Sequence, residues 1–259
     1  MSLNLQILKG GKNLRLIIEL ETKSGHEFVL PIQYNYLVQS MIYRSLDSDF
    51  ANFLHEQGFE SGDRQFKLFV FSRLLGKFRM DRAKNKIIFQ SPIKLIVVSP
   101  IHQFCQSLSN GLLTKKDLHL GFNAAVVKEI NVQNPTIGEE TVKMRTLSPV
   151  VAYSTLMRPE GGKYTCYFQP GENEFTRLVN LNLKNKYKAL HAEKAPEGEV
   201  EIRTLGNPKL HVMQYKEIVI KGYSATLILS GSKILLQLAL DTGLGSKNSM
   251  GFGCLEKTF

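Results

Sequence analysis

GLGSKNSMGFGCLE, residues 243–256, places four glycines within eleven positions near the C-terminal end of this 259-residue chain. They form two Gly-x-Gly pairs, Gly243, Gly245, Gly251 and Gly253. Glycine is favoured where the backbone needs a positive φ or lies very close to a ligand. The loop follows a helical pattern and opens a strand, whereas a dinucleotide fingerprint follows a strand and opens a helix. We interpret it either as a helix cap with a tight turn or, as we favour, as a loop that contacts a polyanion backbone.

The residues between the two glycine pairs fit a phosphate ligand. Lys247, Asn248 and Ser249 stand there, and the Lys247 ammonium together with free backbone N–H groups would meet phosphates. A P-loop is excluded because Lys247 follows Ser246 and precedes Asn248, so the Gly-Lys-Ser/Thr order is missing. The sequence predicts that these three residues and the four glycines contact the ligand.

Outside the loop, the chain repeats one order of apolar segments. Strand patterns in the first half lie at residues 13–22, 67–74, 87–92, 94–100 and 118–122, and helical patterns at 34–58 and 101–113. Strand patterns in the second half lie at residues 124–132, 141–154, 223–230 and 251–257, and helical patterns at 172–193 and 232–243. Each half follows approximately a β-α-β-β-α-β order. The sequence predicts an α+β fold of two tandem ferredoxin-like domains, residues 1–122 and 123–259.

Composition and charge narrow the function. The formal net charge of +10 favours an anionic partner, with nucleic acid as the first expectation and a membrane surface as the second. No apolar run approaches the roughly 20 residues of a membrane-spanning helix, and residues 1–16 lack the pattern of a signal peptide. The three cysteines are far apart and odd in number, which suits a reducing cytoplasm. No metal-ligand spacing occurs, and no cofactor is expected.

Several stretches, taken together and in order, resemble one family over essentially the whole chain. They are YLVQSMIYRSL, FLHEQGF, FKLFVFSRL, TLSPV, FQPGENEFTRLVNLNLKNKYKAL and the glycine loop. The chain resembles the CRISPR-associated endoribonucleases of the Cas-six type, within the repeat-associated mysterious protein superfamily. The resemblance implies a metal-independent ribonuclease that cuts precursor CRISPR RNA within each repeat.

The resemblance also implies a tyrosine, a histidine and a lysine in the N-terminal domain as catalytic residues. By motif position these are Tyr43, His55 and Lys67. The Lys67 match is the loosest, because the segment between Gly58 and Phe66 varies in length within the family. Arg64 or Lys77 are the alternatives for that role.

The residues themselves give independent support for two of the three. At about 100° per residue, Tyr43 lies opposite the apolar stripe of the first helical segment, so it is not simply core filler. His55 lies outside the stripe of Phe50, Phe53 and Leu54, close to a helix end, where the imidazolium form is favoured. A half-buried surface tyrosine and an exposed surface histidine are the structural alternatives. His26, in a hairpin-like turn, is the only rival histidine.

Three such residues suit internal transesterification of RNA. A base removes the proton of a ribose 2′-hydroxyl, an acid protonates the departing 5′-oxygen, and a cation stabilises charge on the phosphoryl oxygens. The nucleophile is already attached to the substrate, so no metal is required to deliver it. We assign His55 as the principal proton-transfer residue, Tyr43 as its partner and Lys67 as the stabilising cation. Which of the first two is the acid stays open.

A basic segment at residues 73–86 is the candidate for holding the RNA. It is predicted to form a hairpin, with Asp81 as its one acidic residue and six cations: Arg73, Lys77, Arg79, Arg82, Lys84 and Lys86. Such a hairpin suits phosphate contacts, although a charged edge that prevents strand pairing is the alternative. The basic run at residues 183–190 is interpreted instead as the solvated face of a helix.

Two other classes of function compete with a repeat-cutting enzyme. One is a non-cutting RNA-binding subunit of a CRISPR effector complex, which would not need the Tyr-His-Lys set. The other is a basic ferredoxin-like protein that binds a small molecule or an acidic protein, since a fold alone does not fix function. The sequence leaves open the repeat sequence, the cut position, whether the protein is a homodimer, and which effector complex receives the product.

Overall fold

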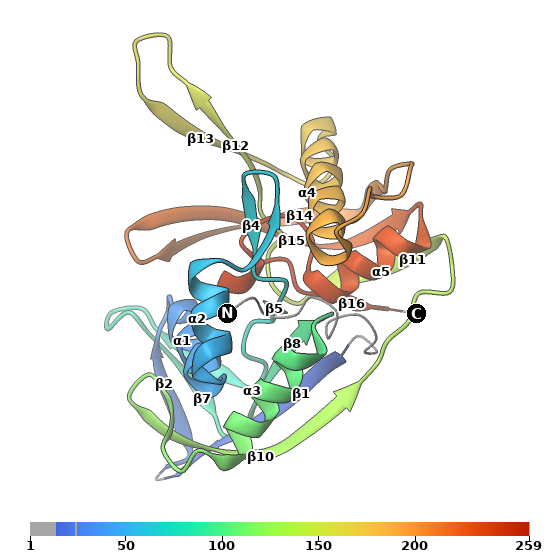
Figure 1. The fold of residues 1–259 in the computed structure, drawn as a ribbon. Coiled ribbons are helices and arrows are strands. Elements are labelled where there is room, and N and C mark those ends of the chain that lie inside the picture. Colours follow the sequence, from blue (N-terminus) through green and yellow to red (C-terminus); the bar gives the residue numbers. More distant parts are fainter. Residues whose placement is uncertain (1–13, 24, 259) are drawn as a thin grey trace.

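Two antiparallel sheets, one in each half of the chain, organise the molecule (Figure 1). The computed structural model describes residues 14–23 and 25–258. The elements of the first half are β1 (Leu14–Thr22), β2 (Glu27–Pro31), α1 (Asn35–Ser45), α2 (Ser48–Glu56), β3 (Phe59–Ser61), β4 (Arg64–Phe66), β5 (Val70–Phe71), β6 (Phe78–Asp81), β7 (Lys86–Gln90), β8 (Ile93–Ser99), α3 (His102–Thr114), β9 (Leu118–Leu120) and β10 (Asn123–Gln133). Those of the second half are β11 (Thr141–Thr146), β12 (Ala152–Met157), β13 (Lys163–Phe168), α4 (Asn173–His191), β14 (Glu201–Tyr215), β15 (Ile218–Ser230), α5 (Lys233–Thr242) and β16 (Leu255–Lys257).

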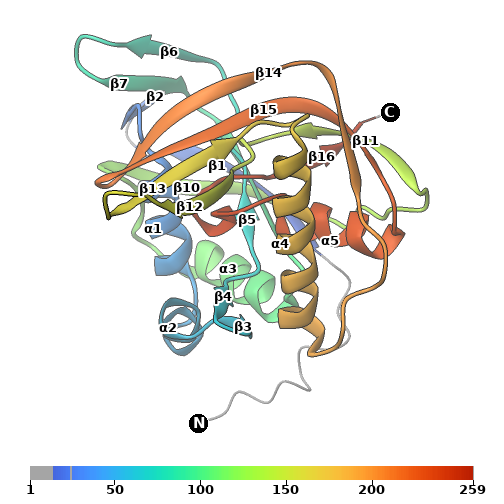
Figure 2. The same cartoon turned by 90° about the horizontal axis from the view of Figure 1, so that it is seen from above.

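The strand order confirms the predicted fold class. The first sheet has the order β5-β8-β1-β10-β9, and the second has the order β14-β15-β11-β16. We number the main strands along the chain, as β1, β5, β8 and β10 in the first half and β11, β14, β15 and β16 in the second. Both sheets then have the strand order 2-3-1-4, which is the ferredoxin-like arrangement. Helices cover one face of each sheet, α1 and α3 in the first half and α4 and α5 in the second (Figure 2). Both halves are therefore ferredoxin-like domains in tandem.

The predicted boundary between the halves, between residues 122 and 123, falls immediately before β10. β10 was expected to open the second domain, but it pairs with β1 from Arg15↔Gln133 to Thr22↔Ala125. It is therefore the fourth main strand of the first sheet, and the second half begins only after Gln133. The short β9, expected to close the first domain, adds an edge to β10 instead.

The first helical segment is two helices rather than one. The chain leaves the helix at Leu46, whose backbone is extended, and Asp47 then caps α2 by accepting hydrogen bonds from Asp49 N and Phe50 N at 3.1 and 3.3 Å. A short polar side chain that can cap a new helix competes with helix continuation at that point. Consequently Tyr43 lies on α1 and His55 lies on α2.

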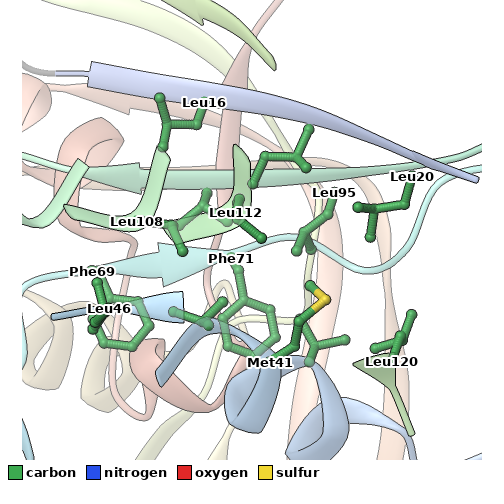
Figure 3. Packing of buried hydrophobic residues seen from close by; sticks show 14 of the residues in the cluster. Leu16, Leu20, Met41, Leu46, Phe69, Phe71, Leu95, Leu108, Leu112 and Leu120 are labelled. Carbon is green, nitrogen blue, oxygen red and sulfur yellow. The ribbon is translucent and has the colours of Figure 1, made fainter. Parts of the chain in front are cut away.

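Each half has its own core, and a smaller cluster joins them. In the first half, side chains of the sheet interlock with those of α1 and α3, including Leu16, Met41, Phe71 and Leu108 (Figure 3). The joining cluster consists of Val70, Ile96, Val98, Leu147 and Cys254.

The TLSPV motif reinforces this junction. Ser148 Oγ donates to Phe71 O at 3.1 Å and accepts from Cys254 N at 3.0 Å. One hydroxyl thus ties the first domain to the strand that follows the glycine loop.

The expectations about membrane segments concern two parts of the chain. The sequence predicts that residues 1–16 are not a signal peptide, and residues 1–13 of that stretch lie outside the described residues. Among residues 14–23 and 25–258, no helix is long and apolar enough to cross a membrane.

Candidate functional site

A cleft of about 610 Å³ lies where the two halves meet. The segment from β4 to β5 forms one wall, and β12, α4 and the glycine loop form the others. Five cationic residues line it: Arg64, Lys67, Arg177, Lys186 and Lys247. None of the described residues that line it is acidic. Such a surface attracts a polyanion.

Lys67 is fixed at the end of the helix that carries His55. Its ammonium Nζ donates a hydrogen bond to the backbone oxygen of His55 at 3.1 Å. Gly58, with a φ of +69°, lets the lysine approach, because a Cβ there would lie 2.6 Å from Phe66 O and 3.2 Å from Lys67 Nζ. Partial burial lowers the pKa of Lys67. The cation is thus anchored where α2 ends and faces the cleft.

His55 lies in the last turn of α2 and its side chain is exposed. The buried side of the helix is formed by Phe50 and Leu54, which leaves the imidazole on the solvent side, as the sequence predicted. No hydrogen bond holds this imidazole within the described part of the chain. It is therefore accessible to a substrate that lies across Lys67.

Tyr43 packs against one of the residues that line the cleft. Its ring packs edge-on against Phe69, with ring centroids 5.9 Å apart, and Phe69 lines the cleft. Burial, reinforced by the nearby Tyr215 hydroxyl, raises the pKa of Tyr43 to about 12. The tyrosine therefore keeps its proton at neutral pH.

The face of α1 that carries Tyr43 is fixed against the glycine loop by two residues, Gln39 one turn before Tyr43 and Asn35 two turns before it. Gln39 Nε2 donates to Ser249 O at 2.7 Å, and Asn35 Nδ2 donates to Met250 O at 3.0 Å. Tyr43 continues the same i, i+4 face. The structure thus places Lys67 in the cleft with its ammonium at the backbone of His55, and places Tyr43 against Phe69, which lines the same cleft.

The alternative residues fall in two places. Arg64 also lines the cleft and is exposed, so it can contact the ligand of Lys67. His26 and Lys77 lie elsewhere: the backbone oxygen of His26 accepts from Ser91 N, and that of Lys77 accepts from Gln90 N. Both therefore flank the end of β7, on the separate sheet β2-β7-β6.

The four glycines of the loop have structural roles. All four have positive φ and are buried. A Cβ on Gly253 would lie 2.0 Å from Leu244 O, and one on Gly251 would lie 2.4 Å from the Phe71 ring. The N–H groups of Gly251 and Gly253 already donate, to Asn248 O and Pro149 O. The expectation of free N–H groups for phosphates is therefore not met at these two positions.

The loop residues between the glycine pairs reach the cleft. Lys247 and Ser249 line it with partly exposed side chains, and Ser246 joins them. Lys247 Nζ lies 5.0 Å from the centroid of the Tyr153 ring, and burial lowers its pKa. Asn248 is buried and donates to Leu244 O and Phe252 O, so it holds the loop together. The loop presents a lysine and two hydroxyls on a rigid frame.

Lys186 is a cleft residue that the sequence analysis missed. It belongs to the run at residues 183–190, interpreted as a solvated face, yet it is only 2% exposed. Its ammonium donates to Gly243 O at 2.7 Å and to Gly245 O at 3.1 Å, and burial lowers its pKa to about 7. The helical position of Lys186, one turn after buried Leu183, was the available signal.

The predicted basic hairpin exists, but one member is misplaced. β6 and β7 form the hairpin, and Lys77, Arg79, Arg82, Lys84 and Lys86 are exposed on it. Arg73 precedes it and packs against Met213, and burial lowers its pKa. The predicted hairpin begins at Arg73, whereas β6 begins at Phe78. Arg79 is paired with Glu27 at 2.9 Å, which reduces its free charge.

Comparisons with known proteins agree across the whole chain. The family model described as "CRISPR-associated protein Cas6, N-terminal" matches residues 29–158, and "CRISPR associated protein Cas6, C-terminal" matches residues 132–257. The CRISPR-associated endoribonuclease Cas6 1 of Methanocaldococcus jannaschii is 27% identical over 240 residues, which are 91% of this chain and 90% of the relative. Cas6 of Pyrococcus furiosus is 26% identical over 94% of this chain and 89% of its own length. A solved structure described as "CRISPR associated protein Cas6" has a TM-score of 0.78, 25% identity and coverage of 96% of this chain and 100% of its own.

Proposed function

The chain belongs to the Cas6 family, and on that premise we propose that it is an endoribonuclease that cleaves precursor CRISPR RNA within the repeat. The relatives from two archaea are named CRISPR-associated endoribonucleases. The proposed reaction needs no metal ion. A ribose 2′-hydroxyl attacks the neighbouring phosphorus, leaving a 2′,3′-cyclic phosphate upstream and a 5′-hydroxyl downstream.

One observation carries this proposal: the hydrogen bond from Lys67 Nζ to the backbone oxygen of His55. The bond holds the ammonium of Lys67, a cleft residue, against the backbone of the residue proposed to transfer protons, and none of the described residues that line the cleft is acidic. Internal transesterification needs this combination, because negative charge gathers on the phosphoryl oxygens while protons move at the attacking and leaving oxygens. A protein that only binds RNA gains nothing from an exposed histidine at that point.

The environment of Tyr43 suggests how the roles divide. With a pKa raised to about 12, the hydroxyl is protonated at neutral pH and is a poor general base. We assign it the donor role, either to the leaving 5′-oxygen or to a phosphoryl oxygen. His55 then takes the proton of the 2′-hydroxyl, and Lys67 stabilises the charge on phosphorus.

The cleft supplies the binding surface for the nucleotides around the scissile bond. Lys247 and Arg64 present charge from two sides of it, and Tyr153 offers a ring beside Lys247. Arg177 is paired with Glu174 at 2.6 Å, so its contribution to phosphate binding is smaller. The basic hairpin would extend the contact along the RNA backbone.

The test is incubation of the purified protein with a labelled CRISPR repeat RNA in the presence of EDTA. We expect cleavage to persist and to give the cyclic phosphate and 5′-hydroxyl ends. A repeat with a 2′-deoxy sugar at the scissile position should bind and remain intact. Loss of cleavage in EDTA that magnesium restores would refute the metal-free mechanism, and binding without any cleavage would favour a non-cutting RNA-binding subunit.

A further inference from the structure

A second groove, of about 850 Å³, lies on the N-terminal half and shares no lining residue with the cleft. Its walls come from four elements: β2, the exposed face of α1, the turn of the β6–β7 hairpin, and the turn between β9 and β10. The proposed chemical step uses none of its residues, although Lys84 and Lys86 also belong to the basic hairpin. Its contents therefore need their own explanation.

The β9–β10 turn presents a fully exposed aromatic ring at this groove. Phe122 is 105% exposed, and no ring contact holds it within the described residues. The Phe122 ring therefore has its face free for a ligand to cover. Tyr36 of α1, 39% exposed, is a second ring that lines the groove.

The exposed ring is held in a rigid frame. The Asn123 side chain accepts from Val29 N at 3.0 Å and donates to Val29 O at 3.0 Å, so it takes the place of a neighbouring strand on the edge of β2. It also donates to Leu120 O at 2.9 Å and closes the turn. Gly121, with a φ of +62°, packs closely against Leu37. Phe122 is thus presented on a fixed turn rather than on a loose loop.

Positive charge surrounds the ring. Arg44, Lys84, Lys86 and His119 line the groove, and none of its described lining residues is acidic. Lys84 lies 4.0 Å from Asp81, and within the described residues Arg44 and Lys86 have no ion pair. Exposed aromatic rings among unpaired cations are the composition of a surface for single-stranded nucleic acid, where bases stack and phosphates meet the charges.

We propose that this groove binds single-stranded RNA, with one base stacked on Phe122 and the adjoining phosphates at Arg44 and Lys86. The inference rests on the proposed function only in taking RNA as the ligand. Lys84 in the turn and Lys86 at the start of β7 form the tip of the basic hairpin, so the groove continues the surface expected to hold the repeat. RNA that leaves the hairpin would enter the groove directly.

The chain contains no tryptophan, which gives a direct test. Phe122→Trp introduces the single tryptophan at the groove, and Leu113→Trp introduces it at another exposed apolar position, 64% exposed at the end of α3. Titration with a decamer of adenosine ribonucleotides should quench Phe122→Trp and leave Leu113→Trp nearly unchanged. Equal quenching of both, or of neither, would overturn the proposal. A change in Phe122→Trp emission with protein concentration alone would overturn it in favour of a second copy as the occupant.

Affinity provides the second measurement. Phe122→Ala should weaken decamer binding by about 5- to 100-fold, the usual loss for one stacked base, whereas Leu113→Ala should not. The double variant Arg44→Ala/Lys86→Ala should weaken it more than Lys115→Ala/Lys116→Ala, which removes the same charge from the far end of α3. Absence of cleavage by the wild type would refute the proposed function without touching this result.

Discussion

At the scale of single residues, we expect chemistry and affinity to depend on different side chains. In the proposed function His55 and Tyr43 each supply one protonic group, and the affinity for RNA comes from many cations spread over the cleft and the hairpin. Lys67 belongs to both sets, because it is a cation at the cleft and also touches the backbone of His55. Removal of His55 therefore separates the two contributions most clearly.

We expect His55→Ala to slow single-turnover cleavage of the repeat by about 10²–10⁴-fold, the usual contribution of a proton-transfer group. The dissociation constant should change little, because the imidazole is one exposed group among many contacts. Folding should also be unaffected, since the His55 side chain packs against nothing in the buried face of α2. Rapid-quench kinetics at saturating protein and a filter-binding titration measure the two quantities.

His26→Ala is the matched control, because this histidine is also exposed but lies on the sheet β2-β7-β6. It should cleave at the wild-type rate. If His26→Ala loses activity and His55→Ala retains it, the catalytic site has been assigned to the wrong histidine even though the family is right.

At the scale of elements, the glycine loop is a packed connector whose exposed middle reaches the cleft. An aspartate in place of Gly253 would disturb folding before it could report on RNA, because its Cβ would overlap the backbone oxygen of Leu244. Lys247 is the loop residue whose loss would report on RNA contact, since its side chain is partly exposed at the cleft.

Gly253→Ala should lower the free energy of unfolding by several kcal/mol, about 3 or more, through this overlap and the positive φ of +79°. Gly198→Ala is the control, with a φ of +89° and open space around the position. It should cost only the conformational strain, about 1–2 kcal/mol. Urea titrations of both variants give the comparison. Equal losses would show that the loop relaxes around the new methyl group.

The basic hairpin makes a prediction about salt. Lys77→Ala/Arg82→Ala should weaken RNA binding and reduce the slope of log affinity against log salt by about one for each lost phosphate contact. Arg79→Ala should have a smaller effect, because its guanidinium is already paired with Glu27 at 2.9 Å. Binding titrations at several salt concentrations test this. If Lys77→Ala/Arg82→Ala leaves the salt slope unchanged, the hairpin does not contact RNA phosphates, and its charges serve to prevent strand pairing at the sheet edge.

Local patterns explain which elements could be predicted. The helices α3, α4 and α5 and the strands β7 and β8 follow from apolar spacing, since that spacing is a property of each segment alone. The sequence does not predict that β10 belongs to the first sheet, because an apolar strand pattern carries no information about which strand it pairs with. The β12–β13 hairpin was missed because its outer residues are exposed and lack clear alternation.

The candidate site shows the same limit. Tyr43, His55 and Lys67 are proposed from a family resemblance, and for the first two also from their places on helices. Lys186 was missed because its neighbours Lys184 and Lys188 are more exposed and the run as a whole has the composition of a solvated face. Only tertiary contact with Gly243 and Gly245 distinguishes it.

At the scale of the whole molecule, buried polar groups lie where the halves join. Arg15 of β1 is 4% exposed, and its guanidinium donates to Leu255 O on β16 and lies 4.0 Å from Glu256. Asp241 of α5 is 3% exposed and accepts from Gln237 Nε2 at 2.9 Å. Arg15 thus links β1 of the first half to the last strand, and the protonation of Asp241 couples the stability of the protein to pH.

Asp241 makes this coupling measurable. Burial raises its pKa from 3.8 to about 7, opposed by the Gln237 hydrogen bond and the charge of Arg15. Between these two pH values the folded state binds more protons at this site than the unfolded state does. Its contribution to stability is therefore fully present below about pH 4, declines as the pH rises to 7, and stays lost above that value.

Asp241→Asn removes the ionisation and keeps an oxygen that can accept from Gln237, while Arg15 retains Glu256 as its counter-charge. We expect the variant to equal the wild type near pH 4 and to exceed it above pH 7 by about 1–4 kcal/mol in the free energy of unfolding. Urea titrations at pH 4.5, 6 and 8 measure the difference. Asp63→Asn, at an exposed aspartate between β3 and β4, controls for the loss of one negative charge. A difference that is the same at all three pH values would show that Asp241 is ionised in the folded state, with Arg15 rather than burial as the dominant influence on it.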